Sequence, residues 1–315
     1  MKSQAQNIVF FGTSEFAVPT LEALINVKYE IAAVITRPDK PIGRKQALSP
    51  SPIKILARQK NIKVLQPITL KSDEFFESFK KFNPDICIVT AYGKIIPSQY
   101  IEIPKYGFLN IHPSLLPKYR GPSPIQTAIL NGEKEMGVTI IMVDEEVDHG
   151  LLLSTIAYSL SSKAYYKEIE KELAELGAKL LIETLPKYIR GEIAPEPQDH
   201  SQATFTKILS RENGRINWNE PAEKICNQIR ALNPEPGTWT TWNNKVINIP
   251  IFNVGYPQVE ENKPGMVIKV NKDIFVATGK GYLKLETIQL EGGREMPVKS
   301  FVNGYKDFIG SALDT

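Results

Sequence analysis

Two side chains able to act on a carbonyl group stand two residues apart in the segment LNIHPSLLP, residues 109–117. If residues 109–112 form a strand, alternate side chains point to opposite faces, so Asn110 and His112 share one face. Pro113 then ends the strand and leaves His112 at its tip. An amide can donate a hydrogen bond to a developing oxyanion, and an imidazole can move a proton near neutral pH. The pattern indicates chemistry on a carbonyl, although a lone Asn-Xaa-His more often marks a hydrogen-bonded structural pair.

A second polar segment, DEEVDHG at residues 144–150, follows the strand predicted at 138–143. A carboxylate from this segment can orient the His112 ring and stabilise its protonated form. Gly150 allows the backbone to turn sharply there. Spacing alone does not distinguish the candidate carboxylates, and an acidic surface turn is the alternative interpretation. The four candidates are Asp144, Glu145, Glu146 and Asp148.

The elements that would position these groups alternate between strands and helices. This order predicts an α/β fold with a doubly wound, mostly parallel sheet. In such sheets, sites form at the C-terminal ends of the strands. We expect strands at 7–11, 31–36, 63–66, 86–90, 109–112 and 138–143, and helices at 16–25, 52–59, 127–130 and 167–188.

The sequence changes character after a polar, proline-containing stretch. We therefore expect a catalytic domain at 1–190, a linker at 191–206 and a smaller domain at 207–315. In the last part, a helix at 222–231 precedes short β-like segments separated by turn residues, which indicates a small β-barrel or sandwich. These segments are 245–252, 265–270, 274–278 and 282–289.

Composition excludes several classes of protein. The apolar fraction is 42%, and no apolar run approaches the roughly 20 residues that a membrane helix needs. The polar N-terminus lacks the apolar core of a signal peptide. Cys87 and Cys226 are too far apart for a metal or redox motif. The first turn has a single glycine, Gly12, and no phosphate-loop signature occurs, which disfavours nicotinamide enzymes and ATPases. We expect a cytoplasmic protein without a metal or membrane partner.

Basic residues are concentrated near the N-terminus. Between Arg37 and Lys63 there are eight lysines and arginines but only one acid, Asp39. Such a cluster can bind a polyanion, and a solvated surface is the alternative interpretation.

The chemistry-bearing residues resemble the signature of folate-dependent formyltransferases. The resemblance rests on Asn110, His112, the SLLP of 114–117, and Asp148 followed by Gly150. The family's catalytic Asn, His and Asp fall on Asn110, His112 and Asp148. Two positions depart from the family: Pro113 stands where Gly or Ala is common, and His149 stands where Thr is common. Neither departure removes a catalytic group.

The resemblance extends over nearly the whole chain and is strongest to family members that act on aminoacyl-tRNA. It includes FGTSEFA at 11–17, RPDKPIGR at 37–44, PSPIK at 50–54, AYGKIIP at 91–97, RGPSPIQ at 120–126 and RALNP at 230–234. It implies a folate pocket formed by Tyr92, Gly93, Ile95, Ile96, Ser114, Leu115, Leu116, Pro117 and Asp144. Leu115, Leu116 and Pro117 have plain packing as an alternative role. The basic loop, with Arg37, Lys40, Arg44 and Lys45, is implied to bind tRNA. Because it contains Pro38, Pro41 and Gly43, we expect it to be mobile without tRNA.

The resemblance implies a Rossmann-like catalytic domain followed by an OB-like, tRNA-binding domain. It also implies transfer of formyl from 10-formyltetrahydrofolate, as co-substrate, to the α-amine of methionyl initiator tRNA, giving N-formylmethionyl-tRNA for translation initiation. No metal is implied, and we expect a monomer. A sugar-amine formyltransferase would share the same catalytic residues. A non-enzymatic RNA-binding protein is a further alternative, because a barrel and a basic loop can form such a surface.

Overall fold

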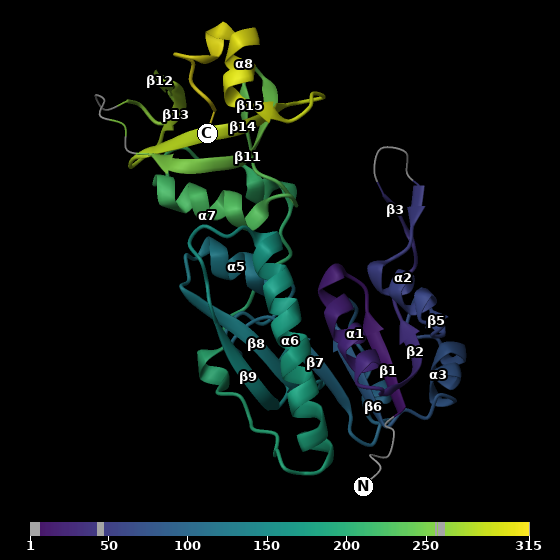
Figure 1. Cartoon of the computed structure of the whole chain (residues 1–315). Coiled ribbons are helices and arrows are strands. Elements are labelled where there is room, and N and C mark those ends of the chain that lie inside the picture. The colour runs from purple at the N-terminus through teal and green to yellow at the C-terminus, as the bar shows by residue number, and fades with distance from the viewer. Residues whose placement is uncertain (1–6, 43–46, 256, 258–261, 315) are drawn as a thin grey trace. The chain divides into compact units, whose positions relative to one another are not determined.

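The computed structural model describes residues 7–42, 47–255, 257 and 262–314 (Figure 1). The chain divides into two compact units. The first comprises residues up to 124, 135–160 and 168–206, and the second comprises 125–134, 161–167 and the chain from 207 onward. Within the described residues, no helix is both long and apolar enough to cross a membrane.

The first unit is built on a seven-stranded sheet. The strand order is β5 (Val64–Leu65), β2 (Glu30–Ile35), β1 (Asn7–Gly12), β6 (Ile86–Thr90), β7 (Phe108–His112), β8 (Glu135–Met142) and β9 (Leu152–Ser159). The first five strands in this order are parallel, and β8 and β9 run antiparallel to their neighbours. The chain builds outward from β1 in one direction and then in the other, so the order reverses between β1 and β6. The prediction of a doubly wound, mostly parallel sheet is confirmed.

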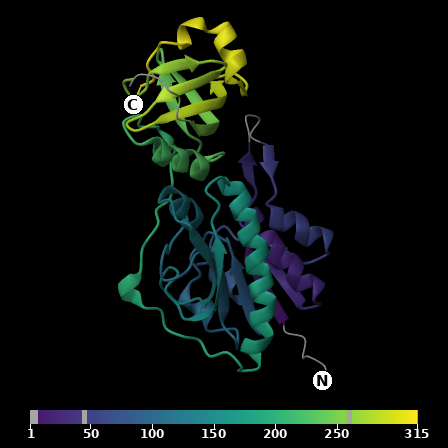
Figure 2. The same ribbon diagram turned by 60° about the vertical axis from the view of Figure 1, so that its left-hand side comes forward.

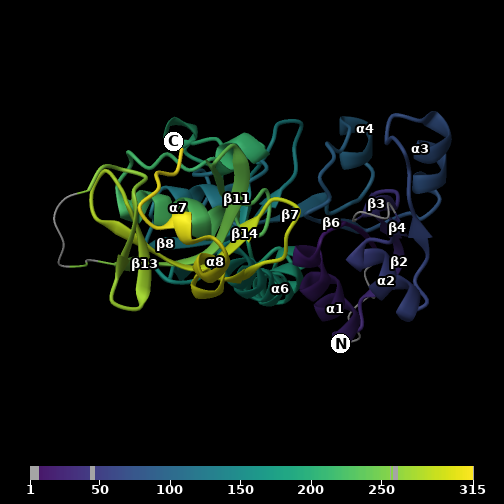
Figure 3. The same ribbon diagram turned by 90° about the horizontal axis from the view of Figure 1, so that it is seen from above.

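Helices cover both faces of this sheet. Seen from above, α3 (Asp73–Lys80) and α4 (Ser98–Ile101) lie on one side, and α1 (Val18–Asn26) and α6 (Tyr166–Ile189) lie on the other (Figure 3). The α3 and α4 side has an aromatic core, in which Phe79 and Tyr100 pack among buried strand residues. Serine caps begin two of the helices: Ser72 accepts from Phe75 N at α3, and Ser51 accepts from Lys54 N at α2 (Pro52–Gln59).

Several local features differ from the sequence-based expectations. The helix expected at 16–25 starts as a 3-10 turn, η1 (Glu15–Ala17), before α1. Helices α3 and α4 and strand β9 were not predicted. Part of the basic loop forms two short antiparallel strands, β3 (Lys40–Ile42) and β4 (Ala47–Ser49). The helix around 127–130 begins earlier, as α5 (Pro124–Leu130).

The second unit contains a sheet of antiparallel strands, drawn in green to yellow in Figure 2. The strand order is β10 (Trp239–Trp242), β11 (Lys245–Gly255), β14 (Tyr282–Leu290), β13 (Asp273–Ala277) and β12 (Val267–Val270). The short β15 (Met296–Pro297) pairs with β14. The C-terminal segment pairs with both outer strands of this sheet. Asp314 pairs with Thr241 of β10, and Ala312 pairs with Met266, which immediately precedes β12. The sheet therefore curls toward closure, in agreement with the expected small β domain.

The core of this unit contains the fully buried Trp218, whose indole donates to Thr240 Oγ1. Packed against the sheet are α7 (Ala222–Leu232) and α8 (Val298–Gly304). The remaining short helices are η2 (His200–Gln202) in the first unit, and η3 (Arg211–Gly214) and η4 (Lys306–Phe308) in the second.

Candidate active site

Asn110 and His112 lie on the last residues of β7. Their neighbour Ile111 points to the opposite face, where it packs close to Gly177 of α6. The alternation predicted from LNIH is therefore present: apolar side chains anchor the strand from one side, and the two polar side chains share the other. His112 is buried, and Asn110 is half-buried.

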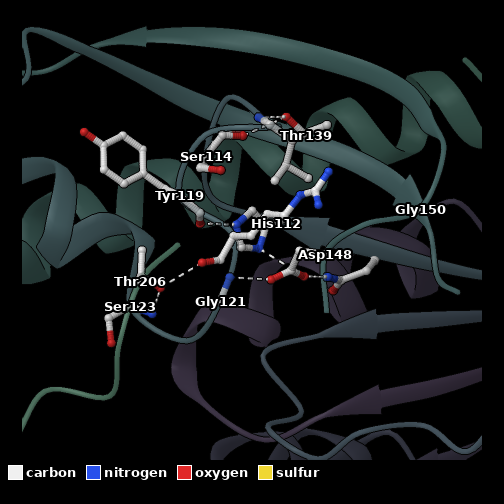
Figure 4. Close-up of polar contacts among 12 residues, drawn as sticks. His112, Ser114, Tyr119, Gly121, Ser123, Thr139, Asp148, Gly150 and Thr206 are labelled. Carbon is white, nitrogen blue, oxygen red and sulfur yellow. Dashed lines mark hydrogen bonds and ion pairs between the residues drawn. The ribbon is translucent and has the colours of Figure 1, made fainter. Parts of the chain in front are cut away.

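Asp148 reaches both of these side chains with one oxygen atom (Figure 4). Its Oδ1 accepts from Asn110 Nδ2 at 3.2 Å and lies 3.5 Å from His112 Nδ1. Its Oδ2 accepts from the backbone N–H of Gly121 at 2.8 Å. The carboxylate is thus held at three points, and the structure brings together the three residues predicted to be catalytic.

The contacts of His112 define the role of each ring nitrogen. Nε2 lies 3.0 Å from the carbonyl oxygen of Tyr119, which can only accept, so Nε2 carries a proton. Nδ1 faces Asp148. A proton on Nδ1 would point toward the carboxylate, so Asp148 is placed to orient the ring.

The four carboxylates that spacing could not distinguish occupy different surroundings. Asp144 accepts from His149 Nδ1 at 2.6 Å, and Glu146 lies 4.0 Å from the other nitrogen of the same ring. Glu145 is exposed. Among the described residues, only Asp148 is within ion-pair distance of His112.

The turn that carries Asp148 is sterically constrained. Asp148 has a φ of 51°, in the left-handed region, which costs a residue with a side chain about 1–2 kcal/mol. Two residues later, a Cβ on Gly150 would collide with the carbonyl oxygen of Met142. Only glycine allows this close approach of two backbone segments. The turn therefore needs partners that hold it in place.

The segment proposed to line a folate pocket follows β6. Tyr92 is buried and packs edge-on against Phe11, and burial raises the pKa of its phenol well above the ordinary value. Gly93 has a φ of 73°, and its Cα lies against the Arg37 guanidinium. Ile96 is buried, whereas the Ile95 side chain is 74% exposed. This loop presents backbone and one apolar side chain, a suitable surface for a flat heterocycle.

The segment from Ser114 to Pro117 is tightly packed. Ser114 Oγ donates to the Lys118 carbonyl at 2.6 Å, and Thr139 Oγ1 donates to the Ser114 carbonyl. Leu116 is buried, and its backbone N–H donates to Thr139 Oγ1. Leu115 lies close to Gly137 of β8. These contacts fix the chain just after β7 and so hold the end of the strand that carries His112.

Two of the four predicted tRNA-binding residues fall within the described part of the chain. Lys40 is exposed on β3. Arg37 Nε is buried and has no hydrogen-bond partner among the described residues. Arg44 and Lys45 lie outside the described residues.

The base of the basic loop is fixed by a partly buried polar cluster of Lys54, Asp39 and Gln66. Lys54 Nζ donates to Asp39 and to Gln66 Oε1, each at 2.6 Å. Gln66 Nε2 in turn donates to Asp39 and to the Arg37 carbonyl. The hydrogen bond from Lys54 lowers the pKa of Asp39. The cluster ties the start of the loop, at Arg37 and Asp39, to α2 and to the residue that follows β5.

Sequence reasoning missed three polar residues beside the site, Arg120, Gln198 and His200. Arg120 was noted only as part of a family motif, and the other two fall in a stretch interpreted as a linker. Arg120 donates to Gln198 Oε1 and lies 2.8 Å from His200 Nδ1. No spacing pattern identifies them, because they meet the site through long-range backbone pairing. In the described part of the chain, no group of three or more His, Cys, Asp or Glu side chains is placed to hold a metal.

The sequence matches the formyl transferase family in both units. Residues 6–185 match "Formyl transferase" and residues 208–306 match "Formyl transferase, C-terminal domain". Together these matches cover most of the chain. The fold and the sequence therefore define a formyl transferase.

Curated relatives give a finer assignment. The chain is 42% identical to the methionyl-tRNA formyltransferase of Caldanaerobacter subterraneus, over 97% of this chain and 99% of the relative. It is also 42% identical to that of Caldicellulosiruptor saccharolyticus, over 98% and 99% respectively. The chain belongs to the methionyl-tRNA formyltransferases.

Solved structures with lower identity share the fold. An N-formyltransferase from Helicobacter canadensis, in complex with folinic acid and dTDP-3-aminofucose, matches with a TM-score of 0.68 at 20% identity, over 93% of this chain and all of that one. HypX from Aquifex aeolicus, in complex with tetrahydrofolic acid, matches with a TM-score of 0.65 at 18% identity, over 98% of this chain and 48% of that one.

The constrained turn generates a first prediction. Gly150→Ala forces the backbone away from Met142 and displaces Asp148, so formyl transfer should fall about 100-fold. The rate is measured with saturating substrates, alongside the melting temperature. Gly304→Ala is the control, because a Cβ there meets nothing within 4 Å. Wild-type turnover by Gly150→Ala would show that the turn tolerates displacement.

Proposed function

We propose that this enzyme transfers the formyl group of 10-formyltetrahydrofolate to the α-amine of methionyl initiator tRNA, with Asn110, His112 and Asp148 as the catalytic residues. The observation that carries the proposal is the convergence of these three side chains at the end of β7. An amide, an imidazole and a carboxylate in mutual contact suit attack by an amine on a formyl carbon. The product is N-formylmethionyl-tRNA, the substrate of translation initiation.

Each residue has a separate task when the amine attacks the formyl carbon and negative charge develops on the formyl oxygen. Asn110 uses one N–H on Asp148, which leaves its second N–H for the oxyanion. Both nitrogens of His112 already face protein oxygens. To donate to the substrate, the His112 ring must therefore give up its contact with either the Tyr119 carbonyl or Asp148. Asp148 keeps the ring oriented and stabilises the positive charge that develops on it. The proton lost by the amine is passed through these side chains to N10 of the folate. The bond between N10 and the formyl carbon breaks, and tetrahydrofolate leaves.

The loop after β6 and the acidic turn are the proposed folate surface. The exposed Ile95 side chain and the backbone at Tyr92–Ile96 can cover a pterin ring, while the Asp144 carboxylate can accept from its N–H groups. The SLLP segment at 114–117 is the proposed wall. Because Ser114 and Leu116 are buried, their contribution is to hold this wall in shape.

The acceptor is assigned to tRNA by the basic loop and the relatives. Arg37 and Lys40 are two of the eight basic residues between 37 and 63, a stretch with only one acid, which suits a phosphate backbone. The Helicobacter canadensis N-formyltransferase, solved with dTDP-3-aminofucose, is only 20% identical, whereas two methionyl-tRNA formyltransferases are 42% identical over nearly the full length. A direct test is folate-dependent formylation of charged initiator tRNA, with an amino-sugar nucleotide as the competing acceptor. Formylation of the sugar alone would overturn the assignment.

The two donors at the end of β7 generate a prediction about the oxyanion. Asn110→Ala and His112→Ala should each reduce turnover by about 100- to 1,000-fold, as expected for loss of an oxyanion donor. Single-turnover formylation rates are compared with the far-ultraviolet circular dichroism of each variant. Near-wild-type rates in either variant would contradict its catalytic role.

The choice among the carboxylates is also testable. Asp148→Asn keeps the shape but removes the charge facing His112, so turnover should fall more than tRNA affinity does. Glu146→Gln, on the same turn but far more exposed, is the matched control and should remain active. If Glu145→Gln or Glu146→Gln proved the more damaging change, the carboxylate would be assigned wrongly.

The basic loop generates a prediction about tRNA. Arg44→Ala should weaken the use of methionyl initiator tRNA and leave folate affinity unchanged, because arginine binds phosphate through a planar, multidentate head. Loss of one phosphate contact should also flatten the slope of log affinity against log salt by about 1. Formylation rates are measured against tRNA concentration at several salt concentrations, with folate binding measured separately. A parallel fall in folate affinity would exclude a tRNA-specific role.

A further inference from the structure

The segment between the two matched domains is bound to the first unit through backbone pairing. Glu196 and Leu152 exchange two backbone hydrogen bonds, of 2.7 and 2.9 Å, at the start of β9. In this antiparallel register, Gln198 lies opposite Gly150. Further along, Arg120 forms a parallel bridge with Phe205, donating to the Thr204 carbonyl and accepting from the Thr206 N–H. Thr204 Oγ1 also accepts from Tyr119 N. The segment is therefore attached on both sides of Gln198.

The Gln198 side chain points into the turn that carries the catalytic carboxylate. Its Nε2 donates to the backbone carbonyls of Asp148, at 2.9 Å, and Gly150, at 2.8 Å. Only 5% of the residue is exposed. Both N–H groups of one amide thus hold the two ends of a three-residue turn.

A buried guanidinium fixes the orientation of this amide. Arg120 is 4% exposed, and its Nη2 and Nε donate to Gln198 Oε1 at 2.7 and 3.2 Å. Because Arg can only donate, it requires the amide oxygen on its side and directs Nε2 toward the turn. Arg120 has no carboxylate partner among the described residues, so this buried charge depends on neutral acceptors.

His200 supplies the second neutral acceptor. Its Nδ1 lies 2.8 Å from Arg120 Nη2 and must be unprotonated to accept. The His200 ring stacks on His149, with centroids 4.2 Å apart and planes 6° apart. His149 in turn bonds to Asp144. The departure from the family at position 149 therefore provides a surface against which His200 is held.

We propose that Gln198 is a positioning residue that holds Asp148 against His112, with Arg120 and His200 fixing its orientation. The proposal rests on the proposed catalytic role of Asp148. Its physical basis is the left-handed φ of Asp148, a conformation that persists only where the surroundings enforce it. Asn110 and Gly121 hold the carboxylate, and Gln198 holds the backbone behind it. The segment at 191–206 is thus part of the active site as well as a connection.

The variant Gln198→Glu separates positioning from stability. A carboxylate keeps the contact with Arg120 and adds an ion pair, so the fold should survive. Its other oxygen then faces two carbonyl oxygens and repels the turn. We expect kcat to fall about 10- to 100-fold, with KM for tRNA and folate changed less than about twofold. If Gln198→Glu does not fold, Gln198→Met, which keeps the volume without the donors, is expected to show the same loss.

The control is Gln202→Ala, an exposed glutamine on η2 whose side-chain amide donates to Asp199. It should leave kcat unchanged. The chain has three histidines, so nitrogen-15 spectra of labelled histidine resolve each ring. Gln198→Glu should shift the His112 signals, and Gln202→Ala should not.

Three outcomes would overturn the proposal: wild-type kcat in folded Gln198→Glu, a rise in KM alone, or unchanged His112 signals. If the wild-type enzyme formylates no charged tRNA, the proposed function fails. The histidine spectra still test the positioning role in that case.

Discussion

The three-point hold on the Asp148 carboxylate is the interaction on which the site depends. One carboxylate accepts from an amide on β7, faces an imidazole on the same strand and accepts from the backbone N–H of Gly121. These contacts draw together the end of β7, the loop that follows it and the turn after β8. An unpaired buried carboxylate would be costly, so the loops must adopt the arrangement that satisfies it. The Asp148 side chain therefore both positions Asn110 and His112 and stabilises the fold of the surrounding loops.

The antiparallel course of β8 explains why this hold is needed. His112 pairs with Thr139, and Leu109 pairs with Met142. The C-terminal end of β8 therefore lies beside the N-terminal end of β7. Its following turn must fold back along the sheet for Asp148 to reach Asn110. The expectation that polar residues gather where parallel strands end accounts for His112 but not for Asp148. Asp148 reaches the site because the chain after β8 turns back along the sheet. This turn depends on the left-handed backbone of Asp148 and on the missing Cβ of Gly150.

Much of the fold followed from alternation and spacing. β6 and α2 have the predicted bounds, and the LNIH pattern placed Asn110 and His112 on one face of β7. The carboxylate could not be chosen from spacing, since four acids within five residues differ only in where the turn directs them. The residue that faces His112 was identified by resemblance. Arg120, Gln198 and His200 escaped both approaches, because pairing between residues about 80 positions apart brings them together. Helix α3 was missed because its apolar residues are few and adjacent aromatics obscure the helical period.

The backbone pairing of residues 196–206 with the first unit limits how this protein can be divided. The helix α6 ends at Ile189, and a boundary there looks natural on the ribbon. Yet the chain beyond α6 pairs with the start of β9 at Leu152 and with the loop after β7 at Arg120. In a chimera that exchanges C-terminal domains between relatives, the junction that preserves the first unit therefore lies after Thr206. Exchange of C-terminal domains during evolution would be subject to the same restriction, so the connecting segment should be inherited with the first unit rather than with the C-terminal domain.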